Sequence, residues 1–445
     1  MAETPSSGPM STEGSRIAEL AKQAPSMSFT NLSQYLTYWA LWLAFVRTKP
    51  DRAPGVDGQT VEAYRENLKS NLEDLLSRAK SGTYRAPPVK RAYIPKGTGK
   101  ETRPIGIPTV EDKVLQRAVV MVLEQIYEQD FLDCSYGFRP GRSAHQALDT
   151  LWQRLMGMGG GWVVEVDIRK FFDTLDHARL REFLQRRVSD GVLLRLIGKW
   201  LKAGVLEDGA ISIPDEGTPQ GGVISPLLAN IYLHYVLDEW YEREVKPRLK
   251  GESFLIRYAD DFVMGFSCEE DAKRVMAVLP KRFAKYGLTL HPDKTRLVPF
   301  ARPSQRPGSE AKGPQPGTFD LLGFTHFWGR SRRGGWVIQR KTARDRFRRA
   351  ITKIALWCRT NRHQPVAEQH ATLRRKLCGH DAYYGITGNY RALAWFRRVV
   401  ARIWRHWLAR RRAGRLSWHH FEPLLARFPL PKARVVHSVY AAKPT

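Results

Sequence analysis

Residues 254–266 read FLIRYADDFVMGF, in which two adjacent carboxylates lie between two apolar runs. The apolar runs favour strands and Asp is common in turns, so the segment predicts a β-hairpin with the acids at its tip. Asp260 and Asp261 repel each other, and burying both charges is costly unless a cation lies beside them. Two interpretations stay open for this segment alone: a divalent-cation site, or a hairpin turn that is merely acidic.

A third acid favours the cation site. Asp167 lies near the end of the apolar run GWVVEVDI at 161–168, which predicts a buried strand. Its side chain points away from those of its two neighbours, because strand side chains alternate. If this strand end lies beside the hairpin tip, three carboxylates meet and can hold two Mg²⁺ ions, which activate an attacking hydroxyl and stabilise a leaving pyrophosphate. Asp173 and Asp176 instead predict the turn and cap that begin a helix.

The net charge of the chain indicates a polyanionic partner. Of 445 residues, 72 are Lys or Arg and 44 are Asp or Glu, which leaves a net charge of +28. A protein this basic usually binds nucleic acid. Neither a membrane span nor a secretory signal is visible, so we expect a cytoplasmic location without a membrane partner. The four cysteines lack the paired spacing of a zinc site.

Composition divides the chain into five segments. Residues 1–28 are rich in Ser, Pro and Gly and predict disorder, and 29–90 predict an N-terminal extension with helices. Residues 91–335 mix strands and helices without a regular alternation, which is typical of the α+β class. Residues 336–430 predict a helical domain, and 431–445 form a short tail. A Pro-, Gly- and Ser-rich insertion at 301–317 predicts a surface loop, to which we assign no role.

The helical domain carries most of the positive charge. Residues 330–415 contain 24 basic and three acidic residues. In RALAWFRRVVARIWRHWLARRR at 391–412, apolar pairs recur every four residues and predict a helix with one apolar stripe that packs in a core. Its arginines fall mostly outside the stripe, and a rigid row of guanidinium groups suits a phosphate backbone. These residues are Arg397, Arg398, Arg402 and Arg405.

The order of these motifs resembles a reverse transcriptase palm. Asp167 in its strand, GTPQGGVISPLLANIYL at 217–233 and YADD at 258–261 are similar to motifs A, B and C of that family. More narrowly, the chain resembles the bacterial group II intron-encoded reverse transcriptase/maturases over about residues 50–430. The stretches that carry this resemblance are APGVDG, IPKGTGKETRPIGIPTVEDKVLQRAV, YGFRPGRSAHQAL and KLCGHDAYYGITGN.

The resemblance implies a fold, an activity and partners. The fold would be a right-hand polymerase of the α+β class, with an N-terminal extension and first fingers segment over 29–90, fingers and palm (antiparallel sheet plus helices) over 91–335 and an α-helical thumb (maturase domain X) over 336–430. The activity would be RNA-directed DNA polymerisation with two Mg²⁺ ions, combined with a maturase role in group II intron splicing and in mobility by target-primed reverse transcription. The partners would be intron RNA, an RNA template with a DNA primer, target DNA and dNTPs in a bacterial cytoplasm.

The resemblance also implies roles for single residues. Asp167, Asp260 and Asp261 would be catalytic metal ligands, assisted by the backbone carbonyl of Ile168. The nucleotide would contact Lys96, Arg103, Phe172, Gln220 and Lys294; the primer would contact Gly323 and Phe324; and RNA would contact Arg139, Arg142, Arg397, Arg398, Arg402 and Arg405.

Several of these residues also have plainer interpretations. The ring of Phe172 would exclude a ribose 2′-hydroxyl, and the alternative of an ordinary core phenylalanine suits Phe171 better. Lys294 would protonate the departing pyrophosphate, or it is a solvated turn lysine. Phe324 would grip the primer, or it is an ordinary apolar strand residue.

Two further functions stay open. One is a binding-only splicing maturase with an idle polymerase, and the other is a domesticated reverse transcriptase that acts in defence or repair. The intact carboxylate set favours an active polymerase, because an idle one has no use for an acidic cluster. The cysteine pairs of the endonuclease found in many relatives are missing, so we expect no second-strand cleavage from this chain.

Overall fold

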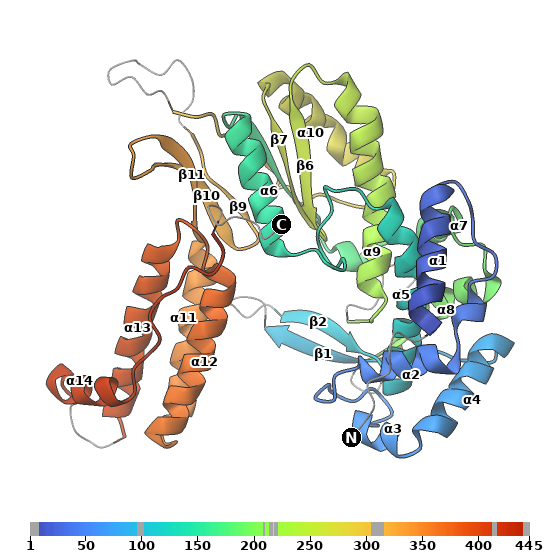
Figure 1. Cartoon of the computed structure of the whole chain (residues 1–445), viewed down its shortest axis with the longest axis horizontal. Coiled ribbons are helices and arrows are strands. Elements are labelled where there is room, and N and C mark those ends of the chain that lie inside the picture. The colour runs from blue at the N-terminus through green and yellow to red at the C-terminus, as the bar shows by residue number, and fades with distance from the viewer. Residues whose placement is uncertain are drawn as a thin grey trace.

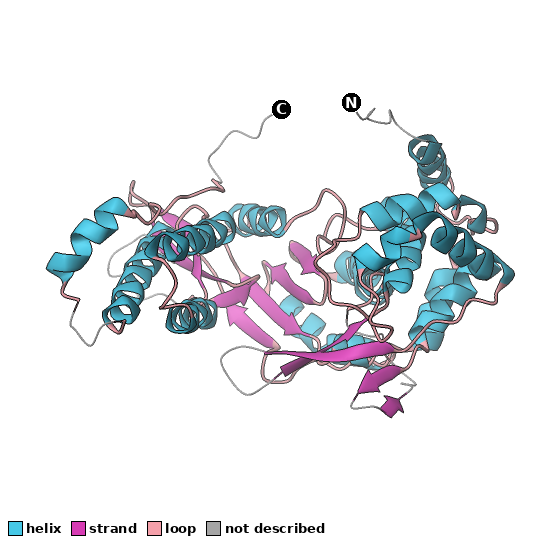
Figure 2. Cartoon of the chain, turned by 90° about the horizontal axis from the view of Figure 1, so that it is seen from below, coloured by secondary structure: helices cyan, strands magenta, loops and turns pink. Residues whose placement is uncertain are grey.

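Figure 1 shows the fold of the chain. In the view of Figure 2, helices gather at both ends of the molecule and strands lie between them. The computed structural model describes residues 9–95, 102–207, 210–212, 217, 221–303, 316–411 and 416–438. Within these ranges no helix is long and apolar enough to cross a membrane. Helices and largely antiparallel sheets share one chain, which confirms the predicted α+β class.

The N-terminal helices pack around the long helix α5 (Val110–Asp130), which α1 (Pro9–Gln23) and α2 both contact. Helix α1 lies within the stretch 1–28 that the sequence predicts to be disordered, so that prediction is wrong for this segment. Ile17 and Ala21, one turn apart, are almost fully buried and hold α1 against the core. The other helices of this part are α2 (Tyr38–Val46), α3 (Val61–Glu66) and α4 (Leu68–Ser81).

A four-stranded sheet next to these helices has the order β2-β1-β4-β5. Strands β1 and β2 form an antiparallel hairpin in which Ile94 is opposite Arg103. The turn of this hairpin lies outside the described residues. The strands are β1 (Val89–Pro95), β2 (Thr102–Ile107), β4 (Val205–Glu207) and β5 (Ala210–Ser212).

A second four-stranded sheet, with the order β6-β7-β3-β8, holds the acidic residues. Val163 faces the helix α6 (Ala144–Gly157), whereas Val164 and Val166 pack with α9 and α10 on the other face. Both faces are therefore buried, which explains the uninterrupted apolar runs around the acids. The elements are β3 (Trp162–Asp167), β6 (Ser253–Tyr258), β7 (Asp261–Phe266), β8 (Arg296–Pro299), α9 (Ser225–Leu233) and α10 (Glu269–Ala284).

Helices α7 (His177–Gln185) and α8 (Gly191–Leu201) lie between β3 and β4 in the chain. The Asp176 carboxylate accepts hydrogen bonds from the backbone N–H groups of Ala178 and Arg179, which confirms its predicted role as a helix cap. Beyond α9 the chain continues as two π-helical turns, His234–Asp238 and Tyr241–Val245.

A three-stranded sheet leads into the C-terminal helices, which form a separate bundle in Figure 1. The predicted boundary at residue 336 falls at the start of β11, because the hairpin β10–β11 precedes the first helix of the bundle. Every fourth residue of α13 from Phe396 to Leu408 is buried, as the apolar stripe predicts. The elements are β9 (Phe319–Leu321), β10 (Phe324–Arg330), β11 (Trp336–Thr342), α11 (Arg344–Thr360), α12 (Val366–Tyr384), α13 (Tyr390–Ala409) and α14 (Trp418–Arg427).

Candidate active site

The register of the sheet β6-β7-β3-β8, which we call the palm sheet, brings the predicted acids together. Strand β3 pairs antiparallel with β7, and this register puts Asp167 directly opposite Asp261. Such opposed residues lie about 5 Å apart between their Cα atoms. Asp260 precedes Asp261 in the two-residue turn between β6 and β7. Asp167, which is more than ninety positions from the other two acids in the chain, therefore meets them at one end of the sheet.

The carboxylates affect one another electrostatically. Burial raises the pKa of Asp260, the charge of Asp167 adds to this, and the positive charges of Arg103 and Arg257 oppose it. Asp261 is an exposed residue at the start of β7, although protein atoms surround its carboxylate on several sides. This burial, with the charges of Asp260 and Asp167, raises the pKa of Asp261 to about 7. Like charges gathered in this way are stabilised by a cation.

A lysine supplies one positive charge to the cluster. The Lys294 Nζ atom lies 2.5 Å from the Asp167 carboxylate, and both side chains are partly exposed. The segment before Lys294 is held against β3, because the His291 N–H donates to the Asp167 carbonyl over 2.8 Å. Ile168 forms an isolated bridge with Leu290 whose hydrogen bonds do not use the Ile168 carbonyl.

The three acids fit a divalent cation in charge and in ligand type. Mg²⁺ prefers hard carboxylate oxygens and needs few of them when substrate phosphates complete its shell. Burial first, and then the neighbouring acidic charges, raise the pKa of Asp261, and such a cation would relieve the repulsion among these charges. Among the described residues, however, no three His, Cys, Asp or Glu side chains are gathered into a ready-made metal centre.

Phe172 and Phe171 lie in the short helical turn that follows β3. Phe171 is buried, as the sequence predicts for a core residue, and Phe172 is partly exposed with its ring 5.4 Å from that of Phe171. Gly217, which starts the GTPQGG segment, packs on this turn: a Cβ atom there would lie 2.7 Å from the Phe172 carbonyl oxygen. The candidate residue Gln220 lies outside the described residues.

Arg103 is exposed on β2, in the region predicted to form the fingers. Its positive charge opposes the rise in the pKa of Asp260. A basic residue at this place can neutralise a phosphate bound near the acids. Its predicted companion Lys96 lies outside the described residues.

The hairpin β9–β10 approaches the acids through its turn. A backbone hydrogen bond from Leu322 counteracts the raised pKa of Asp261, so this turn touches the cluster. Leu322 and Gly323 both have positive φ, of 51° and 80°. Phe324 is fully buried and packs with Leu148 and Ile386. The role predicted for the Phe324 side chain is therefore wrong, because a buried ring cannot touch a primer, and only the turn backbone can.

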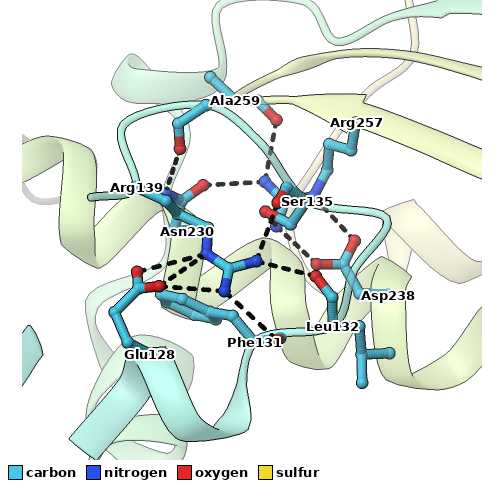
Figure 3. A network of polar contacts seen from close by, with 10 residues as sticks. Glu128, Phe131, Leu132, Ser135, Arg139, Asn230, Asp238, Arg257 and Ala259 are labelled. Atoms are coloured by element: carbon cyan, nitrogen blue, oxygen red, sulfur yellow. Dashed lines mark hydrogen bonds and ion pairs between the residues drawn. The ribbon is translucent and has the colours of Figure 1, made fainter. Parts of the chain in front are cut away.

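Arg139 is a structural residue, which corrects the prediction that it contacts RNA or nucleotide. Its side chain is only 4% exposed and forms an ion pair with Glu128 at 3.0 Å. It also donates to the carbonyls of Leu132 and Ser135, at 2.9 and 2.8 Å (Figure 3). Arg142, in contrast, is partly exposed and forms a surface ion pair, so it stays a candidate for RNA contact.

A second buried arginine, to which the family resemblance assigns no role, donates a hydrogen bond to the turn that contains Asp260. Arg257 is fully buried and contacts Asp238, Asn230 and the carbonyl of Ala259 (Figure 3). The signal in the sequence is an arginine in the middle of the apolar run FLIRY, where an unpaired charge would be very unfavourable.

The thumb arginines divide into two pairs. Arg398 and Arg402 are exposed on α13, and Arg402 lies over the ring of Trp395, which is itself 46% exposed. Arg397 donates to the Pro431 carbonyl at 3.0 Å, and Arg405 donates to the Leu416 carbonyl at 2.6 Å. The donors of Arg397 and Arg405 thus hold later segments of the chain, while both residues are partly exposed, so their contact with RNA stays a prediction.

Trp395 belongs to the first of the apolar pairs (395/396, 399/400, 403/404 and 407/408) that predict the stripe, yet it is exposed. We call Arg398, Arg402 and Trp395 the exposed arginine face of the thumb.

Comparisons with known proteins agree with this geometry. Residues 94–326 match the family described as reverse transcriptase (RNA-dependent DNA polymerase). Protein YkfC of Escherichia coli is 38% identical over 284 residues, which cover 56% of this chain and 74% of YkfC. Group II intron-encoded protein LtrA of Lactococcus lactis subsp. cremoris is 39% identical over 248 residues, 53% of this chain but 40% of LtrA. Nuclear intron maturase 2, mitochondrial, of Arabidopsis thaliana is 27% identical over 330 residues, 62% of this chain and 43% of that protein.

The matched family region spans more than half of the sequence and contains all three acids, strand β2 and the turn at Leu322. Both the relatives and the arrangement of the palm sheet lead to the same assignment. This chain belongs to the reverse transcriptase (RNA-dependent DNA polymerase) family.

Proposed function

We propose that this chain is an RNA-directed DNA polymerase with Asp167, Asp260 and Asp261 as its catalytic metal ligands. The observation that carries the proposal is the register that sets Asp167 against Asp261, beside Asp260 in the hairpin turn. Polymerases of this kind use divalent metal ions, and we propose two Mg²⁺ ions here. Bound at these carboxylates, they would lower the pKa of the primer 3′-hydroxyl and stabilise the charge of the leaving pyrophosphate.

The surrounding residues would position the substrates. Arg103 on the fingers hairpin would pair with the triphosphate, and the Phe172 ring would fill the space of a ribose 2′-hydroxyl. Lys294, within reach of Asp167, would deliver a proton to the pyrophosphate as it leaves. The backbone at Gly323 would support the primer end. Lys96 and Gln220 complete the proposed nucleotide site by resemblance alone.

We further propose that the protein is a maturase for a group II intron and takes part in its mobility by target-primed reverse transcription. The names of its relatives LtrA and intron maturase 2 support this, as does the exposed arginine face. Its partners would be intron RNA, a template–primer duplex, target DNA and dNTPs. The maturase role is one of binding, in which basic surfaces stabilise folded RNA through shape and phosphate contacts.

The proposed layout follows the right-hand polymerase. Fingers and palm would extend from about residue 91 to 335, preceded by an N-terminal extension from residue 29. The helices α11 to α13 would form the thumb that holds the duplex; their bundle is seen in Figure 1, and it meets the rest of the chain near the end of α12, where Tyr383 donates to the Leu322 carbonyl.

Primer extension on an RNA template with Mg²⁺ and dNTPs tests the proposal. We expect wild-type protein to extend the primer and Asp260→Asn to lose extension while it keeps RNA affinity. Asp51→Asn, which changes an exposed turn residue, serves as the matched control and should behave as wild type. If wild-type protein binds intron RNA but extends no primer, the polymerase assignment is refuted in favour of a binding-only maturase.

A further inference from the structure

The turn that carries the two adjacent acids has an unfavourable backbone. Tyr258 pairs with Asp261, so Ala259 and Asp260 form the two-residue loop of the hairpin. Ala259 has a φ of 58°, in the left-handed region that is uncommon for residues other than glycine. Such a conformation costs about 1 kcal/mol or more and persists only where the surroundings enforce it. Something next to this turn must therefore hold it in place.

Arg257 contacts the turn from one side (Figure 3). Its Nη1 donates to the Ala259 carbonyl at 3.1 Å and to Asn230 Oδ1 at 2.9 Å. Its Nη2 donates to Ser135 Oγ at 2.8 Å. Arg257 also forms a bidentate pair with Asp238. Its Nε donates to Asp238 Oδ1 at 2.7 Å, and its Nη2 donates to Asp238 Oδ2 at 2.5 Å. Every nitrogen of the guanidinium thus has a partner, and one of those partners is the strained residue.

Gly137 contacts the turn from a different segment. A Cβ atom at Gly137 would lie 2.3 Å from the Ala259 nitrogen, so only glycine fits there. The Asn230 side chain links both supports, because its Nδ2 donates to the Gly137 carbonyl at 2.7 Å while its Oδ1 accepts from Arg257. The Ala259 peptide is therefore enclosed by Arg257 and by a loop that Asn230 ties to it.

The buried charge is fully compensated. Both Arg257 and Asp238 have side chains with 0% exposure. Burial alone would lower the pKa of Arg257, but the charge of Asp238 and their hydrogen bonds raise it, so the guanidinium stays protonated. A buried pair is weak evidence for a gain in stability over apolar residues of similar size. Its fixed geometry, in contrast, is well suited to orienting a neighbouring peptide.

We propose that Arg257 is a positioning residue for nucleotidyl transfer: it holds the Ala259 carbonyl and thereby fixes the turn that presents Asp260 and Asp261 to the substrate. It touches neither substrate nor metal and acts only through the turn. This inference rests on the proposed polymerase function. To hold the turn, Arg257 must supply the donors of its guanidinium fork and not a positive charge alone.

The test compares Arg257→Lys with Arg187→Lys. Arg187 is 2% exposed, forms an ion pair with Asp130 at 2.9 Å and donates to backbone carbonyls near the end of α1, so the same change there removes a similar buried fork away from the turn. We expect both variants to lose thermal stability and to keep their affinity for template–primer. Only Arg257→Lys should lose about 100-fold in kcat, the size of effect produced by a displacement of about 1 Å at a catalytic group.

Hydrogen–deuterium exchange provides a readout that does not depend on activity. Amides 258–261 should exchange faster in Arg257→Lys and at the wild-type rate in Arg187→Lys. Equal kcat and equal exchange in the two variants would overturn the proposal, whereas absence of extension by the wild type would instead refute the polymerase function.

If Arg257→Lys does not fold, Ser135→Ala supplies the second test, since it removes one hydrogen bond to Arg257 without changing a charge. Faster exchange at 258–261 and a lower kcat support the proposal, and wild-type values of both contradict it.

Discussion

The clustered carboxylates of Asp167, Asp260 and Asp261 should lower the free energy of unfolding, and Asp261→Asn should recover part of that loss. The pKa of Asp261 is raised from 3.8 to about 7. About three units correspond to about 4 kcal/mol at 1.36 kcal/mol per unit. Because Asp261 touches solvent, screening reduces this figure, and we expect a gain of about 1–2 kcal/mol at pH 8 without divalent cations.

The pH dependence has a definite sign. Below about pH 4 the carboxyl is protonated in both the folded and the unfolded state and costs nothing. Between about pH 4 and 7 the unfolded chain has lost the proton while the folded protein keeps it, so wild-type stability falls as the pH rises. The advantage of Asp261→Asn should therefore be large at pH 8 and should shrink as the pH is lowered through 7 towards 4.

Urea unfolding in EDTA at pH 8 and at pH 5, followed by tryptophan fluorescence, measures this difference. Asp51→Asn is the control, because it removes an exposed carboxylate away from the cluster. A stability difference between Asp261→Asn and wild type that is the same at both pH values would refute the reasoning, since it would mean that the carboxyl does not titrate differently on folding. Primer extension by the same variant should be lost.

Three further outcomes follow from the site. Phe172→Ala should incorporate ribonucleotides, which competition between rNTPs and dNTPs in primer extension measures; unchanged discrimination would remove Phe172 from the nucleotide site. Lys294→Met should change the free energy of unfolding by less than about 1 kcal/mol, because its ion pair is exposed, yet lower kcat by about 100-fold or more if Lys294 is the proton donor. Replacing Arg398 and Arg402 together by Gln should weaken RNA binding and make log Kd less dependent on log salt, as filter binding between 50 and 200 mM salt measures; an unaltered slope would place the RNA surface elsewhere.

Local patterns were sufficient to predict much of the secondary structure and the strand ends that carry the three acids of the site. The alternation around Asp167 and the run FLIRYADDFVMGF predict buried strands that end in acids, and the structure has β3, β6 and β7 there. The four-residue spacing of α13 likewise predicts its buried stripe, with Trp395 as the exception. These features depend on residues close together in the chain, whose periodicity the backbone geometry translates directly into a face.

Which residues meet across the fold was decided only by the tertiary structure. The opposition of Asp167 and Asp261 needs a strand register that no local pattern encodes. Arg139 and Arg142 look alike in YGFRPGRS, yet the first is buried in a network with Glu128 and the second reaches solvent.

The amino-acid sequence by itself determined the set of chemical groups and their local periodicity in this protein. Only packing decided that Arg257 lies beneath the acidic turn, because the free energy of a buried arginine depends on partners such as Asp238 and Asn230, which come from another part of the chain.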